Sequence, residues 1–192
     1  FYSVPLQKIN FPSTLIKING TSFANCDKLS QIDLSKNTNF VYESGILMNS
    51  ERTEIKFISD PIAKASSTFK IPEGIIEFTT SISNYTNIIK IIIPSSVIEI
   101  EDTAFSNNKT LETVVIQGNL TSIGNLAFDG ANKLSQINLP DTITYIGTRA
   151  FRGTNLTEVS IPKSLKYLNW GVFDHTKLTE VELKEEIIEI GG

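Results

Sequence analysis

Few residues in this sequence are of the types that carry out chemistry. His175 is the only histidine and Cys26 the only cysteine, which excludes a two-histidine metal site, a cysteine-based zinc cluster and an internal disulfide. His175 stands between Asp174 and Thr176 in an expected turn, where a solvated histidine is favoured over a general base. Cys26 falls in the equivalent turn of an earlier segment and is interpreted as a structural thiol rather than a nucleophile. We therefore predict that the chain is not an enzyme.

A run of acidic residues near the C-terminal end is the best candidate for a metal site. Its members are Glu180, Glu182, Glu185, Glu186 and Glu189. Their spacing lacks the central glycine of an EF-hand loop, so a solvated face is the favoured interpretation over a calcium site. The sequence also lacks a phosphate-cradling glycine loop. We therefore expect no metal and no cofactor.

Asparagine-linked glycosylation is the remaining chemical possibility. Five Asn-x-Ser/Thr sequences occur, at Asn19, Asn84, Asn108, Asn119 and Asn155. They are acceptors if a eukaryote secretes the chain. Their number is only slightly above the chance expectation for this composition, so the sequence leaves their use open.

Composition narrows the class of protein further. The chain has 192 residues, a net charge of -4 and enough apolar residues, 40%, to form a core. This charge argues against nucleic-acid binding, which usually needs a basic face. No run of 18 apolar residues occurs, so we expect no membrane insertion by this segment. The chain begins at Phe1 rather than at a methionine, which suggests a fragment or a processed product.

A repeat with a period of about 23 residues dominates the sequence. This repeat determines where the candidate residues lie in the predicted fold. The units open near positions 6, 29, 66, 88, 111, 134, 156 and 178. In the unit from Leu134, the apolar residues Ile137 and Leu139 alternate as one face of a short strand does. Pro140 follows and ends the strand, because proline has no N–H for the ladder. Residues 1–192 therefore read as a single domain of about eight stacked turns.

Two further slots of the unit predict how the turns fold and stack. A glycine or asparagine slot follows the last apolar residue, and its occupants include Asn19, Gly124, Gly147, Asn169 and Gly191. Because Gly and Asn accept positive φ most readily, we predict a left-handed turn there. A small residue followed by phenylalanine comes next, as in Ala127-Phe128 and Ala150-Phe151. These phenylalanines should stack as a buried spine.

Two units depart from the pattern. The unit from Ser66 has Ile82 and Tyr85 where phenylalanine is expected. The unit from Leu29 is about 14 residues too long for one period. Its extra segment, 40–58, contains two apolar runs around the polar sequence Asn49-Ser50-Glu51-Arg52. Such a pattern predicts a β-hairpin that projects from the solenoid.

The whole pattern, L-x-x-I-x-I-P-x-x-I-x-x-I-G-x-x-A-F, resembles the BspA-type (Treponema pallidum-type) leucine-rich repeat. The insert at 40–58 is similar to the hairpin often found inside such arrays. The resemblance implies a right-handed leucine-rich-repeat solenoid, mainly β with short helical or irregular turns. It also implies a surface or secreted protein of a bacterium or an anaerobic protist, with a role in adhesion.

Two functions from different classes remain open after this comparison. The first is a non-enzymatic, cell-surface or secreted module that binds a protein or glycan partner. The alternative is an intracellular, cytoplasmic scaffold for protein–protein interaction. The feature that separates the two is a signal peptide or membrane anchor, which this sequence does not supply.

Within each strand, the residues two and four positions after the unit start should point away from the core. They form two columns on the sheet, which we expect to be concave. In its middle, Ile92 and Val115 stand side by side on an otherwise polar face. The predicted partner-binding residues are Lys90, Ile92, Thr113, Val115, Gln136 and Asn138. Met48 in the insert and Trp170 are secondary candidates.

The pair Ile92 and Val115 has two interpretations. One is the β-propensity of these residue types on a half-exposed strand. The other is the hydrophobic centre of a protein contact with a polar rim. The sequence does not separate the two.

Overall fold

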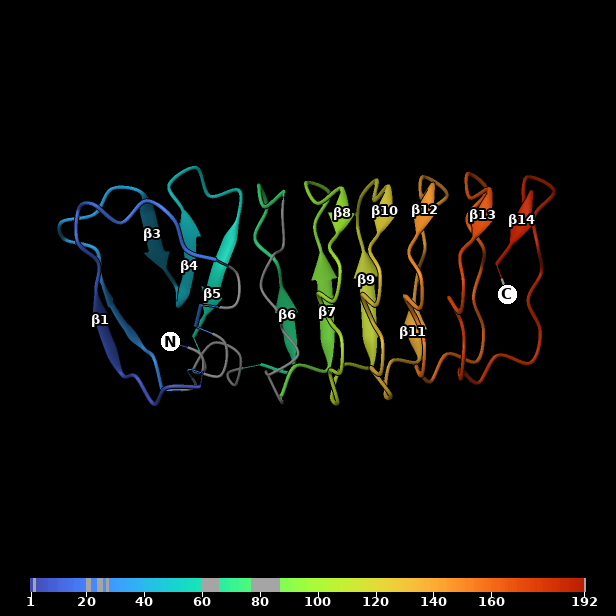
Figure 1. Cartoon of the computed structure of the whole chain (residues 1–192), viewed down its shortest axis with the longest axis horizontal. Coiled ribbons are helices and arrows are strands. Elements are labelled where there is room, and N and C mark those ends of the chain that lie inside the picture. Colours follow the sequence, from blue (N-terminus) through green and yellow to red (C-terminus); the bar gives the residue numbers. More distant parts are fainter. Residues whose placement is uncertain are drawn as a thin grey trace.

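The computed structural model describes residues 1, 3–19, 22–23, 26, 28–59, 66–76 and 87–191. The chain forms a β-solenoid of about seven turns, stacked along one axis (Figure 1). All regular elements in the described residues are β-strands, so the short helical turns allowed for in the predicted fold do not occur there. The prediction of a leucine-rich-repeat solenoid is confirmed. Ile82, Tyr85 and the sequence motif at Asn84 lie outside the described residues.

One row of parallel strands carries the first part of each repeat unit. Its central sheet has the order β11-β9-β7-β6. These strands are β6 (Thr68–Lys70), β7 (Lys90–Ile93), β9 (Thr113–Ile116) and β11 (Gln136–Ile137). At the N-terminal end, β1 (Lys8–Asn10) and β2 (Gln31–Asp33) form a parallel pair of the same kind. Partners across each ladder lie one repeat apart, as Lys90 and Thr113 do.

A second row of shorter strands follows the first part of the repeat unit, and in several units a proline such as Pro94 or Pro140 lies between the two. It contains a sheet of β8 (Glu99–Ile100), β10 (Ser122–Ile123) and β12 (Tyr145–Ile146), and the pair β13 (Tyr167–Leu168) and β14 (Glu189–Ile190). The proline separates the rows as predicted: β7 ends directly before Pro94, whose carbonyl oxygen accepts a hydrogen bond from the Val97 N–H at 3.2 Å. This turn brings the chain back across the core.

The insert at 40–58 corrects the prediction of a projecting hairpin. It is a three-stranded antiparallel sheet of β3 (Phe40–Glu43), β4 (Ile46–Asn49) and β5 (Ile55–Ile58), in the order β3-β4-β5. The expected turn between β4 and β5 is present. Ser44 and Gly45, at φ 48° and 78°, make an additional tight turn before β4. Figure 1 shows the sheet in line with the turns, between β2 and β6, rather than outside them.

The insert lies in line because both of its faces are apolar and buried. The paired residues Leu47 and Phe57 pack into the core of the first two turns, with Phe11 and Phe23. Their neighbours Ile46 and Ile58, also paired, pack into the core of the remaining turns. A hairpin that projects into solvent would expose one of these faces. The insert therefore joins two hydrophobic cores.

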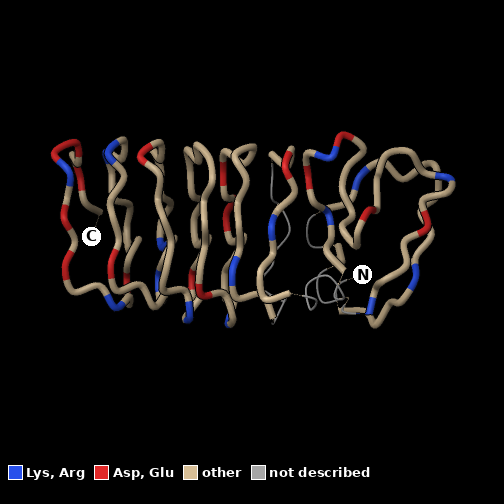
Figure 2. Tube along the Cα trace, turned by 180° about the vertical axis from the view of Figure 1, so that it is seen from behind, with Lys and Arg blue, Asp and Glu red and all other residues tan. Residues whose placement is uncertain are grey.

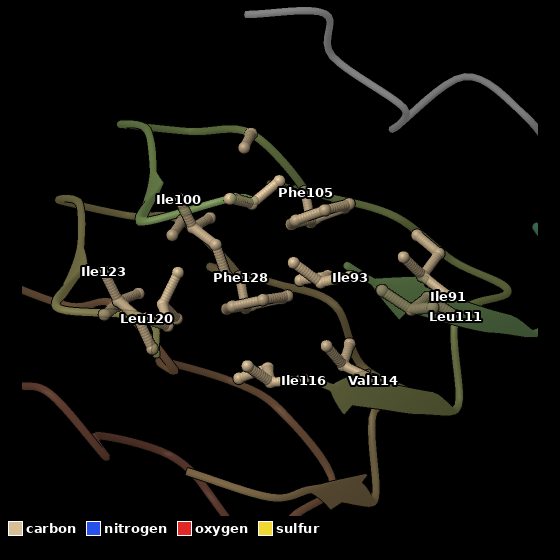
Figure 3. Close-up of a cluster of buried hydrophobic side chains, with 14 of the residues drawn as sticks. Ile91, Ile93, Ile100, Phe105, Leu111, Val114, Ile116, Leu120, Ile123 and Phe128 are labelled. Carbon is tan, nitrogen blue, oxygen red and sulfur yellow. The ribbon is translucent and has the colours of Figure 1, made fainter. Parts of the chain in front are cut away.

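The predicted phenylalanine spine is confirmed. Phe105, Phe128, Phe151 and Phe173 form a continuous stack, with centroid separations of 4.9, 5.2 and 5.6 Å and interplanar angles of 10° or less. Phe128 is fully buried. Figure 3 shows Phe105 and Phe128 between aliphatic side chains of the two strand rows. Phe128 and Phe151 thus each stack on the rings of the turns before and after them.

Replacing Phe128 by alanine should remove about 3–5 kcal/mol of unfolding free energy, because it empties a large, fully enclosed site. Urea or thermal denaturation measures this loss. Phe173→Ala is the matched control: Phe173 ends the stack and is only partly buried, so its loss should be smaller. A loss at Phe128 no larger than that at Phe173 would contradict the spine's role.

The glycine slot corrects a second prediction. Gly124, Gly147, Asn19 and Asn169 do not have positive φ. A Cβ added at Gly124 would instead lie 2.5 Å from the backbone nitrogen of Asp102 in the preceding turn. At Gly147 it would lie 2.5 Å from the Asn125 nitrogen. Glycine is needed in these two turns because two backbones approach too closely for any side chain.

The left-handed residues lie two and six positions after this slot. The first position holds Thr103, Leu126, Arg149 and Gly171, and the second holds Asn107, Gly130, Gly153 and His175. All have φ between 54° and 67°. Most are not glycine, so the residue types give little sign of the conformation. The neighbouring turns impose it through hydrogen bonds such as that from the Arg149 N–H to the Trp170 carbonyl oxygen, at 3.0 Å.

Two alanine substitutions distinguish the two reasons for a glycine in these turns, which are the close approach of two backbones and a positive φ. Gly153 has φ 67°, but a Cβ there would meet its nearest atom only at 3.7 Å, so Gly153→Ala should cost about 1–2 kcal/mol. Gly147→Ala should cost more, because the clash is with backbone and the turns must separate. Gly147→Asn should be equally severe, contrary to the mild effect that a left-handed turn would allow. Equal melting temperatures for Gly147→Ala and wild type would refute the close approach.

Candidate binding surface

The outward side of β6, β7, β9 and β11, here called the main-sheet face, carries the predicted binding residues. Lys90 stands opposite Thr113, and Thr113 opposite Gln136. Ile92 stands opposite Val115. The alternation is as expected, since Ile91, Ile93, Val114 and Ile116 are buried while the residues between them are half-exposed. The structure therefore brings the two predicted columns together on one face.

Ile92 and Val115 form an aliphatic pair on this face. Parallel strands lie about 4.8 Å apart, so the two side chains are close neighbours. Both are half-exposed. Lys90 and Thr113 flank them on the same strands, and Lys70, paired with Ile92 on the other side, is exposed. The pair is thus an apolar spot with a polar border.

Asn138 has a structural role that the sequence did not reveal. Its Nδ2 donates to the Ile116 carbonyl oxygen and its Oδ1 accepts from the Ile116 N–H, each at 2.9 Å. The side-chain amide thereby takes the place of a strand partner for β9, directly after β11 ends. Both polar groups of Asn138 are occupied, so it shapes the face more than it offers hydrogen bonds.

Two shallow hollows continue the main-sheet face toward the C-terminal end. The first, of about 320 Å³, is lined by residues including Val115, Gln136 and Asn138. The second, of about 390 Å³, is lined by residues including Glu158, Glu182 and Lys184. Glu158 borders both. The hollowed surface therefore extends beyond the aliphatic pair.

Charge changes sign between the main-sheet face and the units that follow it. The main-sheet face carries Lys70 and Lys90, and the equivalent positions of the last two units carry Glu158, Glu180 and Glu182. Figure 2 shows the acidic residues of the last turns on the chain trace. Lys184 contacts Glu182 at 3.2 Å, which offsets part of the acidic charge. A partner that spans this face and the last two units would meet lysines at one end and carboxylates at the other.

The two secondary candidates differ in their exposure to solvent. Met48 is only 5% exposed and packs in the core with Ile46 and Ile58, so the proposal that it contacts a partner is corrected. Trp170 is 48% exposed. The guanidinium carbon of Arg149 lies 4.0 Å from the centroid of its ring. Trp170 is thus a surface aromatic residue held by a neighbour.

The residues considered for chemistry lie apart from one another. His175 is exposed, and its Nδ1 contacts Asp174 at 2.9 Å. Cys26 is buried, and its thiol donates to the Phe1 carbonyl oxygen at 2.9 Å, which agrees with a structural thiol. Among the described residues, no three metal-ligating side chains gather closely enough to hold an ion. Nor does this part of the chain contain a helix with the length and apolar character needed to cross a bilayer.

The structure distinguishes the candidate glycosylation sites. Asn19, Asn119 and Asn155 are exposed. Asn108 is fully buried, and its Oδ1 accepts hydrogen bonds from the N–H groups of Thr110 and Leu111, each at 2.9 Å. Asn108 therefore stabilises a turn, and in the folded chain it is inaccessible to a glycosyltransferase.

The sequence reasoning missed a second set of surface residues. Tyr145 and Tyr167 occupy the same outward slot in consecutive units, and both are exposed. The signal was present, because only these two units carry an aromatic residue directly before the last apolar residue. It was overlooked because only the first strand of each unit was considered as a binding face.

The profile of the BspA type leucine-rich repeat region matches six copies, over residues 1–86 and 77–192. Among curated proteins, no sequence matches significantly.

Solved structures of bacterial repeat proteins share the fold. A leucine-rich cell surface protein from Faecalibacterium prausnitzii A2-165 superposes with a TM-score of 0.72 and 20% identity, over 100% of this chain and 49% of that one. The pneumococcal vaccine antigen PcpA superposes with a TM-score of 0.74 and 17% identity, over 96% of this chain and 51% of that one. A leucine-rich repeat protein from Bacteroides ovatus ATCC 8483 superposes with a TM-score of 0.68 and 21% identity, over 97% of this chain and 51% of that one. The chain spans about half the length of these proteins.

Proposed function

Because this chain belongs to the BspA-type leucine-rich repeat family, we propose that it is a non-enzymatic binding module of a cell-surface or secreted protein. Its partner is a protein or glycan recognised through the repeat surface. The family match and the fold shared with a bacterial leucine-rich cell surface protein support this location. Adhesion of the cell that carries it is the proposed role.

The aliphatic pair on the main-sheet face is the observation that carries the proposal. Stable contacts commonly have an apolar centre that loses water on binding, within a polar rim. Ile92 and Val115 provide such a centre, held side by side on hydrogen-bonded strands. Lys90, Thr113 and Gln136 provide the rim. Asn138 supports the rim through its bonds to Ile116.

An intracellular scaffold is the alternative, since the same face could bind a cytoplasmic partner. The location of the chain, on the cell surface or inside the cell, distinguishes the two functions. Antibody against this chain should stain intact cells of the source organism as strongly as permeabilised ones. Staining only after permeabilisation would favour the scaffold.

Introducing charge at the aliphatic pair tests the binding face. Ile92→Glu with Val115→Glu should lower adhesion of the labelled chain to epithelial cells and matrix proteins by tenfold or more, about the effect of losing a binding hot spot. Flow cytometry and surface plasmon resonance measure this. The melting temperature should change little, because both side chains are half-exposed.

Ile98→Glu is the matched control for this experiment. Ile98 is an exposed isoleucine that precedes β8 in the second row of strands, so the same substitution there should leave adhesion intact. Full binding by the double variant would remove the main-sheet face as the site. Loss of binding in Ile98→Glu alone would move the site to the second row.

A further inference from the structure

We propose that the chain has a second ligand surface, formed by Tyr145, Tyr167, Trp170 and Arg149, which binds an uncharged glycan by stacking sugar rings on the aromatic side chains. This aromatic face lies on the second row of strands, away from the main-sheet face. This inference goes beyond the proposed function, because it places a second site on another face of the solenoid and assigns a ligand class to that site.

The aromatic face is a local concentration of exposed rings. Tyr145, Tyr167 and Trp170 are 44%, 49% and 48% exposed. Tyr145 lies on β12 and Tyr167 on β13, neighbouring strands in Figure 1. Equivalent residues on successive turns repeat at about 4.8 Å, close to the length of one pyranose unit in an extended chain. An oligosaccharide running along the solenoid axis could therefore meet one tyrosine per turn.

Arg149 fixes the third ring in place. Its guanidinium carbon lies 4.0 Å from the Trp170 centroid, a cation–π contact. The buried Nε of Arg149 has no hydrogen-bond partner in the described part of the chain, which is unfavourable for a buried polar group. Because the ring is already ordered, a ligand that stacks on it loses little side-chain entropy.

Neutral polar groups surround the rings. Asn125 Oδ1 accepts a hydrogen bond from the Thr148 N–H at 2.9 Å and lies 3.4 Å from the Tyr145 hydroxyl. The exposed Thr144 adjoins Tyr145 in the chain. Glu189 stands opposite Tyr167 in the strand ladder, and Arg149 and Asp174 both lie beside Gly171. The surface thus carries aromatic rings and hydroxyl groups, with charges of both signs around them.

These features favour a sugar over the other ligands that aromatic residues bind. Single-stranded nucleic acid also stacks on rings, but it needs a basic groove along its backbone, and the chain has net charge -4. A protein contact needs an apolar core, whereas the residue opposite Tyr145 in the ladder is Ser122, preceded by Thr121. A pyranose has apolar C–H faces and hydroxyl edges, which match the rings and the polar groups around them.

Trp170 makes the proposal directly testable, because it is the only tryptophan in the chain. Its fluorescence should respond to titration with cellohexaose, chitohexaose or yeast mannan. Stacking removes water from the ring, so we expect a saturable shift to shorter wavelength and slower quenching by acrylamide. Tyr145→Ala with Tyr167→Ala should weaken the apparent affinity by about tenfold. Tyr145→Phe with Tyr167→Phe should retain binding, since stacking remains.

Controls keep this test separate from that of the main-sheet face. Ile92→Glu with Val115→Glu should leave the fluorescence response unchanged, and melting temperatures verify that each variant folds. No response to any of the three sugars overturns the proposal, as does an equal response in the double alanine variant. A response to heparin, single-stranded RNA or an acidic peptide, but to none of the three sugars, also overturns it.

Discussion

Successive turns of this solenoid must lie one strand spacing apart, and the rest of the structure depends on that distance. Backbone hydrogen bonds set it in the strands, and the phenylalanine rings match it with separations of 4.9 to 5.6 Å. In the glycine slot, where the backbones of two turns approach closely, Gly124 and Gly147 leave no room for a Cβ. A spacing suited to strands thus determines both the largest and the smallest side chain of the repeat.

The same requirement explains the insert. A solenoid turn is stable only when neighbouring turns cover its apolar faces. Between β2 and β6, β3, β4 and β5 supply this cover with a different hydrogen-bonding pattern. Leu47 and Phe57 cover the first two turns, while Ile46 and Ile58 cover the rest. The stack therefore continues through a segment that lacks the repeat.

Regular stacking also determines what the surface offers. Each outward slot becomes a column of side chains at fixed spacing, so a patch of one chemical kind arises where neighbouring units carry related residues. Ile92 and Val115 make an aliphatic spot on one row of strands, while Tyr145 and Tyr167 make an aromatic one on the other. Both patches lie on hydrogen-bonded strands.

The sequence by itself determined the repeat, the strand alternation, the proline turn and the phenylalanine spine, because these follow from local periodicity and side-chain size. The placement of Ile92 beside Val115 followed from the same period. The contacts between atoms of different turns could not be predicted from the sequence. The close approach at Gly147, the left-handed conformation of Arg149 and the burial of Met48 depend on which atoms of another turn lie opposite. Glycine tolerates both positive φ and close packing, so residue type alone did not distinguish them; only the tertiary structure did.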